Sequence, residues 1–267
     1  MNQHTKSHID NGSLEENIRS FCKLLSLPVV ATSYAKIALE ATKAKLGYQE
    51  YLYGVLQQQV IARVDNSINA RIKKANFPWI KSLEEFDFSF QPQLDEKLIR
   101  ELGSLNFLST AHNVLFVGPP GVGKTHLAIA LGMKAATARK RTVFFTAESL
   151  IEQLITAEVS HQLPQTLDLL GRLDLLIIDE LGYLEITPQA ASLVFRLISR
   201  RYEKGSIIVT TNKPFEEWGQ IFKDDVVASA ILDRLLHHCY PFFIQGKSYR
   251  MRQLTGSHRV ERKERKQ

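Results

Sequence analysis

Apolar residues in the first part of the chain recur at helical spacing. Ser13 and Glu16 stand three residues apart before such a pattern, which is typical of a capping box at a helix start. Residues 1–12 are polar, and we expect them to be disordered. The predicted helices begin at Ser13, follow Pro28 near residues 34–46, and cover residues 48–74. The sequence thus predicts an all-helical domain over residues 13–76.

The helical pattern breaks after residue 76. Pro78 disfavours helical backbone at the residue before it. Residues 83–90 carry aromatic side chains at every second position, which predicts an extended strap lying on a neighbouring element. A helix is expected near residues 93–102. We place the domain boundary between residues 76 and 92.

From residue 113 onward, short β-branched and apolar runs alternate with helical patterns. Such runs are typical of parallel strands buried on both faces by helices, so the fold class is α/β with a central parallel sheet over residues 77–254. The predicted strands are residues 113–117, 142–146, 174–178, 206–210 and 240–244. The predicted helices are residues 123–138, 147–156, 163–170, 188–203 and 226–237. Residues 248–253 form either a last short strand or a tail, and residues 255–267 are a basic tail that we expect to be disordered.

The composition of the 267 residues is that of a globular protein, with 44% hydrophobic and 23% charged residues, which excludes wholesale disorder. Cys22 and Cys239 are too few for a disulfide framework or, by themselves, a structural zinc site. The N-terminus lacks the apolar segment of a signal peptide, and no uncharged apolar stretch reaches the ~18–20 residues of a membrane span. We expect a soluble cytoplasmic protein with no membrane partner.

The net charge of +6 is unevenly distributed. Residues 1–80 hold 10 Lys/Arg against 6 Asp/Glu, and residues 247–267 hold 8 against 2, whereas the centre is mildly acidic. Basic ends suit a polyanionic partner. They equally suit a well-solvated surface and a loose tail, so charge alone leaves both interpretations open.

A glycine-rich segment matches the phosphate-binding pattern G-x-x-x-x-G-K-[ST] in full and lies between a predicted strand and a predicted helix. Its glycines let backbone N–H groups converge on phosphate oxygens, and the following helix points its positive end at the same anion. Lys124 can reach the β- and γ-phosphates, and Thr125 can offer its hydroxyl to Mg²⁺. The predicted binding residues are Gly118, Pro119, Pro120, Gly121, Val122, Gly123, Lys124, Thr125 and His126.

A second buried run ends in two carboxylates, Asp179 and Glu180. If this strand lies beside the strand before the glycine-rich loop, Asp179 is near the metal and can hold Mg²⁺, directly or through water. Glu180 can then polarise an attacking water as general base. The alternative is an ordinary strand-to-loop turn, but a position about 55–60 residues after the glycine-rich loop favours the functional interpretation.

A third buried run, residues 207–212, ends in small polar residues. Asn212 can hydrogen-bond the γ-phosphate or the attacking water. The alternative is a turn-forming Asn, which the sequence Asn-Lys-Pro suits. Its position in the strand after the acidic pair favours function.

These three elements, in this order and spacing, resemble those of an AAA+ ATPase. Several short sequence motifs also resemble those of the IstB family of insertion-sequence ATP-binding proteins. The stretches that carry this resemblance are residues 84–88, 118–126, 177–184, 201–204, 211–215, 231–235 and 248–252. The likeness covers residues 80–254 closely and the helical part more loosely. The IstB family is related to DnaC, the replicative helicase loader.

The resemblance implies the AAA+ sheet order, with the strand before the glycine-rich loop central. Lys124 and Thr125 map onto Walker A, Asp179 and Glu180 onto Walker B, and Asn212 onto sensor 1, with ATP and Mg²⁺ as the cofactors.

Family members assemble through their ATPase domains, with nucleotide between neighbouring copies. Arg234 then maps onto the arginine-finger position, where a cation neutralises charge on the γ-phosphate of the adjacent subunit. Relatives often carry a second basic residue a few positions on, where this chain has His237 and His238, so which side chain acts stays open. A surface ion pair is the alternative for Arg234.

The family implies an ATP-dependent transposition helper that binds double-stranded DNA, multimerises with ATP and assists a cognate IstA-like transposase, with hydrolysis regulating the assembly. A DnaC-like helicase loader, which would prefer single strands, is the alternative. A non-enzymatic scaffold that coats DNA is a third possibility, which the intact Lys124, Asp179 and Glu180 argue against.

The residues add a candidate DNA surface in the helical domain. Four basic residues lie on or beside its third predicted helix, with polar residues 57–59, 66 and 69 among them: Arg63, Arg71, Lys73 and Lys74. Such side chains suit phosphate contacts that give affinity without sequence readout. A solvated helix face explains them equally well. The insertion at residues 147–172 carries few Lys/Arg and ranks below this helix.

Overall fold

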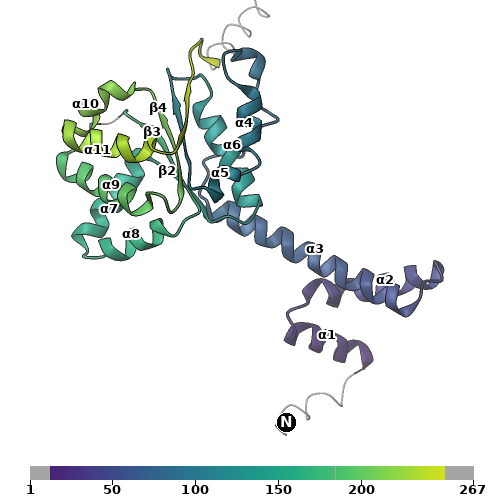
Figure 1. The fold of residues 1–267 in the computed structure, drawn as a ribbon. Helices are drawn as coiled ribbons and strands as arrows, with labels where there is room; N and C mark the ends of the chain where they lie inside the picture. Colours follow the sequence, from purple (N-terminus) through teal and green to yellow (C-terminus); the bar gives the residue numbers. More distant parts are fainter. Residues whose placement is uncertain (1–12, 184, 250–267) are drawn as a thin grey trace, which may run out of the picture. The chain divides into compact units, whose positions relative to one another are not determined.

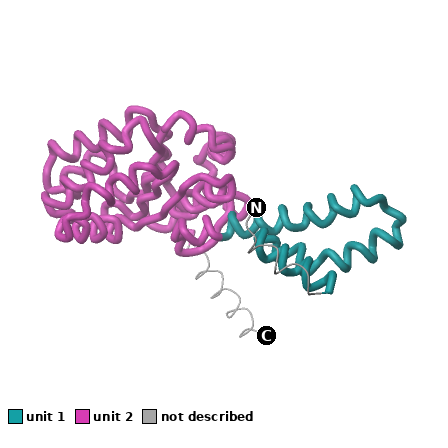
Figure 2. Tube along the Cα trace, turned by 90° about the horizontal axis from the view of Figure 1, so that it is seen from below, with its two compact units in different colours: residues 1–69 teal, residues 70–267 magenta. Residues whose placement is uncertain are grey.

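The structure is a computed structural model that describes residues 13–183 and 185–249. The predictions for residues 1–12 and 255–267, and most of the last predicted strand at 248–253, lie outside the described residues. The chain divides into two compact units, residues 1–69 and 70–267 (Figure 2). This division falls inside a long helix, a few residues before the boundary expected from the sequence.

The first unit consists of helices α1 (Leu14–Leu24), α2 (Pro28–Lys43) and most of α3 (Tyr48–Lys74). The capping box at the start of α1 is confirmed, because Ser13 and Glu16 each accept a hydrogen bond from the backbone N–H of the other. α2 begins at Pro28 and not near residue 34. Proline suits the first helical position, where its missing N–H would have had no partner.

The first unit has a small core, with Cys22, Val30 and Val55 at its centre. Gln59 was expected on a polar surface, and this is wrong because it is only 6% exposed. Its Oε1 accepts hydrogen bonds from the N–H groups of Val29 (3.0 Å) and Val30 (3.4 Å). These donors open α2, which has no side-chain cap of its own, so Gln59 satisfies backbone groups that would otherwise be unpaired.

The second unit contains the predicted parallel sheet, covered by helices on both faces (Figure 1). Its strands are β1 (Asn113–Val117), β2 (Thr142–Thr146), β3 (Leu175–Leu181), β4 (Ser206–Thr211) and β5 (Cys239–Phe243). They lie in the order β2-β3-β4-β1-β5, and all neighbours are parallel. β1 is internal, but β4 takes the middle place and separates β3 from β1. β3 and β1 are therefore not neighbours, which was the condition given for Asp179 to lie near the phosphate loop.

The helices of this unit form two layers on either side of the sheet (Figure 1). One layer contains α4 (Glu96–Leu102), α5 (Asn106–Ser109) and α6 (Lys124–Thr137). The other contains α7 (Ala147–Val159), α8 (Leu163–Gly171), α9 (Pro188–Arg201), α10 (Trp218–Phe222) and α11 (Asp225–Leu236). Side chains alternate between the layers along each strand, so Val114 and Phe116 of β1 pack on the first layer and Leu115 on the second. Among the described residues, no helix is long and apolar enough to cross a bilayer.

Residues 83–90 are not the extended strap that their alternating aromatic residues predicted. The N–H of Phe86 donates to the carbonyl of Leu83 (3.3 Å), and Phe88–Phe90 form the short 3₁₀ helix η2. Leu83 and Phe86 are buried in the same core as α6. The aromatic residues therefore do pack on a neighbouring element, but from a turn and not from a strand.

Arg201, the last residue of α9, is fully buried. Its guanidinium donates to the carbonyl oxygens of Leu170 (2.6 Å), Leu173 (3.1 Å) and Ser206 (2.7 Å). Burial lowers the pKa of Arg201 to about 10, so the side chain remains charged at neutral pH. One cation thus joins the end of α8, the segment before β3 and the start of β4.

Arg201→Met should lower the free energy of unfolding by about 2–4 kcal/mol, because it leaves buried carbonyl oxygens without a donor. Denaturant unfolding measures this loss. Arg200→Met is the matched control, since Arg200 forms an exposed ion pair with Asp168 that is worth at most ~1 kcal/mol. Equal losses in the two variants would contradict the role of the buried guanidinium.

Candidate active site

The loop between β1 and α6 depends on backbone conformations that favour glycine. Gly121 (φ +82°) and Gly123 (φ +99°) lie in the left-handed region. A Cβ added to Gly123 would lie 2.5 Å from Cε2 of Phe86, and one added to Gly121 would lie 2.1 Å from Oγ of Ser248. Conformation and close neighbours therefore both require glycine at these two positions.

Lys124 is the first residue of α6 and is only 7% exposed. Its Nζ donates to the carbonyl oxygens of Gly118 (2.6 Å) and Pro119 (2.8 Å). The ammonium group is thus held against the loop, beside the positive end of the helix that it starts. This arrangement suits a polyphosphate, for which a lysine and helix N–H groups are the usual ligands.

Asp179, near the end of β3, accepts hydrogen bonds from two hydroxyl groups. Oγ1 of Thr125 lies 3.0 Å and Oγ1 of Thr210 lies 2.5 Å from its Oδ1. The carboxyl is 4% exposed, and this burial raises its pKa above the ordinary value, while both hydrogen bonds act in the opposite direction. A threonine hydroxyl and a carboxylate that already touch form an oxygen-only pair of the kind that Mg²⁺ binds.

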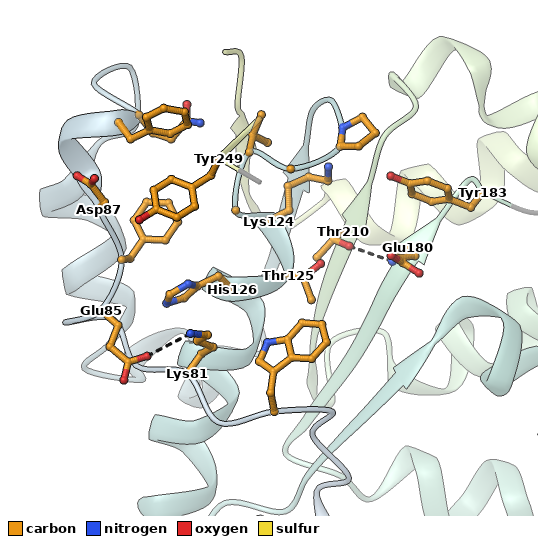
Figure 3. A pocket seen from close by; sticks show the side chains of 18 residues that line it. Lys81, Glu85, Asp87, Lys124, Thr125, His126, Glu180, Tyr183, Thr210 and Tyr249 are labelled. Carbon is orange, nitrogen blue, oxygen red and sulfur yellow. Dashed lines mark hydrogen bonds and ion pairs between the residues drawn. The ribbon is translucent and has the colours of Figure 1, made fainter. Parts of the chain in front are cut away.

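A β-bulge sets the direction of Glu180. The register of β3 and β4 shifts between Ile178 and Leu181, so that Asp179 and Glu180 together oppose the single residue Thr210. Glu180 has φ +62°, which is uncommon for a residue with a side chain, and its N–H donates to Oγ1 of Thr210 (3.0 Å). Backbone strain of this kind concentrates at functional sites. Asp179 faces Thr125, while Glu180 lines the adjoining cavity (Figure 3).

Asn212 directly follows β4. Its Oδ1 is buried and has no hydrogen-bond partner among the described residues. A buried polar atom of this kind usually has a partner, such as a water or a ligand. Gly182 lies against it, since a Cβ added there would be 3.1 Å from this oxygen.

A cavity of about 360 Å³ opens beside the glycine-rich loop (Figure 3). Residues 120–126 line it together with Glu180 and Thr210. Gly118, Pro119, Asp179 and Asn212 do not line it. Sequence reasoning missed Tyr183, which lies beside Glu180, and the whole of the other wall (Figure 3). That wall combines the aromatic and amide side chains of Trp79, Phe86, Phe90, Gln91 and Tyr249 with the charged side chains of Lys81, Glu85 and Asp87. The aromatic residues at 86–90 were the available signal, but their alternation was interpreted as strand geometry.

The two walls of the cavity are joined by direct contacts. The ring nitrogen Nε2 of His126 lies 2.8 Å from the carbonyl oxygen of Ser82, and its ring meets Phe86 edge to face. On the other side, the N–H of Tyr249 donates to the carbonyl oxygen of Gly121 (2.9 Å). His126 thus lines the cavity and also attaches the segment before α4 to α6.

Comparison with known proteins identifies the family. The model of the family described as "IstB-like ATP binding protein" matches residues 20–257. The chain belongs to this family. A protein named for ATP binding in insertion sequence IS21 of Pseudomonas aeruginosa is 49% identical over 214 residues, or 80% of this chain and 81% of that protein. Its counterpart in IS5376 of Geobacillus stearothermophilus is 43% identical over 240 residues, which are 90% of this chain and 96% of that protein.

Solved structures share the fold over about three fifths of this chain. The DnaC helicase loader aligns with a TM-score of 0.51 at 23% identity, covering 61% of this chain and 96% of that one. AMPPCP-bound DnaA from Aquifex aeolicus aligns with a TM-score of 0.54 at 18% identity, covering 63% and 51%. The family and the AAA+ ATPase fold expected from the sequence are therefore confirmed.

Arg234, the candidate arginine finger of this IstB-like chain, lies on α11 and does not line the cavity. Its guanidinium lies 4.7 Å from the ring centroid of Phe195 and donates to the carbonyl of Ala230 (2.9 Å). Among the described residues it forms no ion pair, so the alternative suggested by the sequence is not observed. Its assignment stays a prediction.

The raised pKa of Asp179 can be measured directly. By ¹³C NMR of the Asp carboxyl groups, its pKa should lie above that of an ordinary Asp. Thr210→Val should raise it further, because this change removes a hydrogen bond that favours the charged carboxylate. Thr211→Val is the matched control, since that hydroxyl bonds residue 213 instead. A pKa that falls in Thr210→Val would refute this account of the network.

Proposed function

We propose that this IstB-like protein is an ATP-dependent transposition helper, which binds duplex DNA, multimerises with ATP and assists a partner transposase. Hydrolysis of ATP regulates the assembly. The observation that carries this proposal is the network of Thr125, Asp179, Thr210 and Glu180 beside the glycine-rich loop, in a chain whose relatives are named for insertion sequences.

The residues of the site fit ATP with Mg²⁺. Bound ATP with its metal supplies a γ-phosphoryl group whose negative charge is partly neutralised. Lys124 and the N–H groups of the loop bind the phosphates, and the oxygens of Thr125 and Asp179 hold Mg²⁺. The aromatic wall of the cavity then receives the nucleoside, because base rings bind well against aromatic side chains.

Glu180 is the general base in this proposal. Glu180 lines the cavity, where its carboxylate can accept a proton from a water positioned for attack. Asp179 is less suited to that role, because it is buried and already accepts two hydroxyl groups. Asn212, whose Oδ1 has no described partner, orients the water or the γ-phosphate.

Arg234 acts on the nucleotide of a neighbouring copy. Its position outside the cavity of its own chain supports this, because a side chain that completes a site from the adjacent subunit does not line its own site. The protein therefore assembles through its ATPase units, and a cation from one copy stabilises charge in the next.

A DnaC-like helicase loader is the second candidate, and only the shared fold favours it. Relatives at 49% and 43% identity that are named for insertion sequences favour the transposition helper. Stimulation of the partner transposase by this protein and ATP on duplex DNA tests the choice. Loading of a replicative helicase on single strands, without such stimulation, would support the alternative.

Lys124→Ala and Glu180→Gln should separate binding from hydrolysis. Lys124→Ala should lose ATP binding, because it removes the cation beside the phosphates. Glu180→Gln should keep ATP binding, lose hydrolysis by about 100-fold or more and accumulate as a multimer on DNA. Nucleotide titration, phosphate release and size-exclusion chromatography measure the three effects.

The control for these variants is Glu185→Gln, an exposed carboxylate paired with Lys223 that should leave hydrolysis unchanged. Undiminished ATP affinity in Lys124→Ala would overturn the phosphate site. Wild-type turnover in Glu180→Gln would overturn only the assignment of the base.

The four proposed DNA contacts on α3 differ in exposure and in their hydrogen bonds. Lys73 and Lys74 are exposed, whereas Arg71 is half-buried with its Nε enclosed. Arg63 donates to the carbonyl oxygen of Ser26 (2.7 Å), which stabilises the turn after α1. We therefore assign the phosphate contacts mainly to the two lysines.

Lys73→Gln with Lys74→Gln should weaken duplex DNA binding at every sequence and reduce the slope of log affinity against log salt by about 2, because each lysine neutralises one phosphate. Binding measured at several salt concentrations gives this slope. The matched control is Lys43→Gln with Lys45→Gln, two exposed lysines of which one ends α2 and the other follows it. The same slope in both double variants would leave Lys73 and Lys74 without a role in DNA binding.

A further inference from the structure

A second group of polar side chains lies outside the cavity lining, at the ends of α9 and α11. Glu203 follows α9, while His237 and His238 follow α11. Oε1 of Glu203 lies 3.7 Å from Nδ1 of His237 and 3.9 Å from Nε2 of His238. One ligand atom from each residue lies within 4.8 Å of the other two. No residue of the ATP site belongs to this group.

The geometry points to a metal site, and we propose that Glu203, His237 and His238 bind a divalent transition-metal ion of the zinc class. Two imidazoles and a carboxylate are ligands that such ions prefer, whereas Mg²⁺ prefers oxygen ligands and retains water. A tetrahedral ion with bonds of about 2.0–2.1 Å holds its ligand atoms about 3.3–3.4 Å apart. Movements of a few tenths of an ångström would bring the carboxylate to that distance from each ring nitrogen.

The backbone that carries these ligands is already fixed. The carbonyl oxygen of His238 accepts a hydrogen bond from the N–H of Asn113 (2.7 Å). Asn113 is buried in β1, and its side chain also donates to the carbonyl oxygen of Leu235 (3.0 Å). Glu203 adopts φ +57°, a left-handed conformation that side-chain residues seldom adopt. The site is therefore held between the end of α9 and a strand-anchored end of α11.

Tyr202 determines how many ligands the protein supplies. Its hydroxyl lies 2.6 Å from Nδ1 of His237, and its ring stacks on the imidazole with centroids 5.7 Å apart. The hydroxyl can rotate its O–H away from this nitrogen when the nitrogen binds metal. The protein then supplies three ligands and leaves a fourth position open to water or to another molecule.

The side chains of the group are accessible, with 54% of Glu203, 51% of His237 and 44% of His238 exposed. An ion can therefore enter from solvent. Arg234 lies one turn before His237 on α11, so a bound ion restrains the helix end next to the proposed arginine finger. The metal site itself does not depend on that function.

Titration of the full chain with Zn²⁺ in a buffer that contains Mg²⁺ tests the proposal by calorimetry. We expect one equivalent of Zn²⁺ that Mg²⁺ does not displace, and a Co²⁺ absorption spectrum of low coordination number. His238→Ala and Glu203→Gln should each weaken this binding more than about tenfold, since even loss of a supporting group costs 10–100-fold. His161→Ala, a change at an exposed histidine outside the group, should leave it unchanged.

Circular dichroism establishes that the variants fold. If His238→Ala fails to fold, Glu203→Gln still tests the site, because it replaces an exposed side chain by one of nearly the same shape. Absence of Zn²⁺ binding by the wild-type chain would overturn the proposal. Binding that persists unchanged in both variants would also overturn it, because the ion would then be held elsewhere in the chain.

Discussion

The carboxylate of Asp179 connects three elements at the edge of the sheet where the glycine-rich loop lies. It accepts hydroxyl groups from Thr125 at the start of α6 and from Thr210 in β4, while its own backbone belongs to β3. This meeting is possible because parallel strands end at one edge of a sheet, where the helix that follows the glycine-rich loop also starts. The bulge beside it places Glu180 in the lining of the cavity. One buried acid thus fixes the relative positions of Thr125, Thr210 and the residue proposed as general base.

Much of the second unit could be predicted from the sequence, because its strands are short, continuous apolar runs between long helical patterns. The bounds of β1 and β2 agree with the prediction, and those of the other strands differ at their ends. The glycine-rich loop could also be predicted, because few loops other than phosphate-binding ones combine glycine, lysine and threonine in that order and spacing. These features are local, and local sequence encodes them well.

Features that depend on tertiary contacts could not be predicted in this way. The insertion of β4 between β3 and β1 has no signal in the spacing of the motifs, and Thr210 gained its importance only from the bulge opposite it. Gln59 looked like a surface residue, but its amide satisfies the start of α2. In α3 the apolar stripe predicted the helix correctly, yet Leu52 and Val60 remain exposed. Periodicity reports the conformation of a segment and not what covers it.

The contact between Tyr249 and Gly121 joins the phosphate loop to a segment that lies far from it in the sequence. The backbone N–H of Tyr249 holds a carbonyl oxygen of that loop, and Ser248 packs against the same glycine. Gly121 is therefore held from two directions, by its own left-handed backbone and by a segment more than a hundred residues away in the sequence. A substitution at Ser248 or Tyr249 would disturb the loop without touching any residue of the phosphate-binding motif itself.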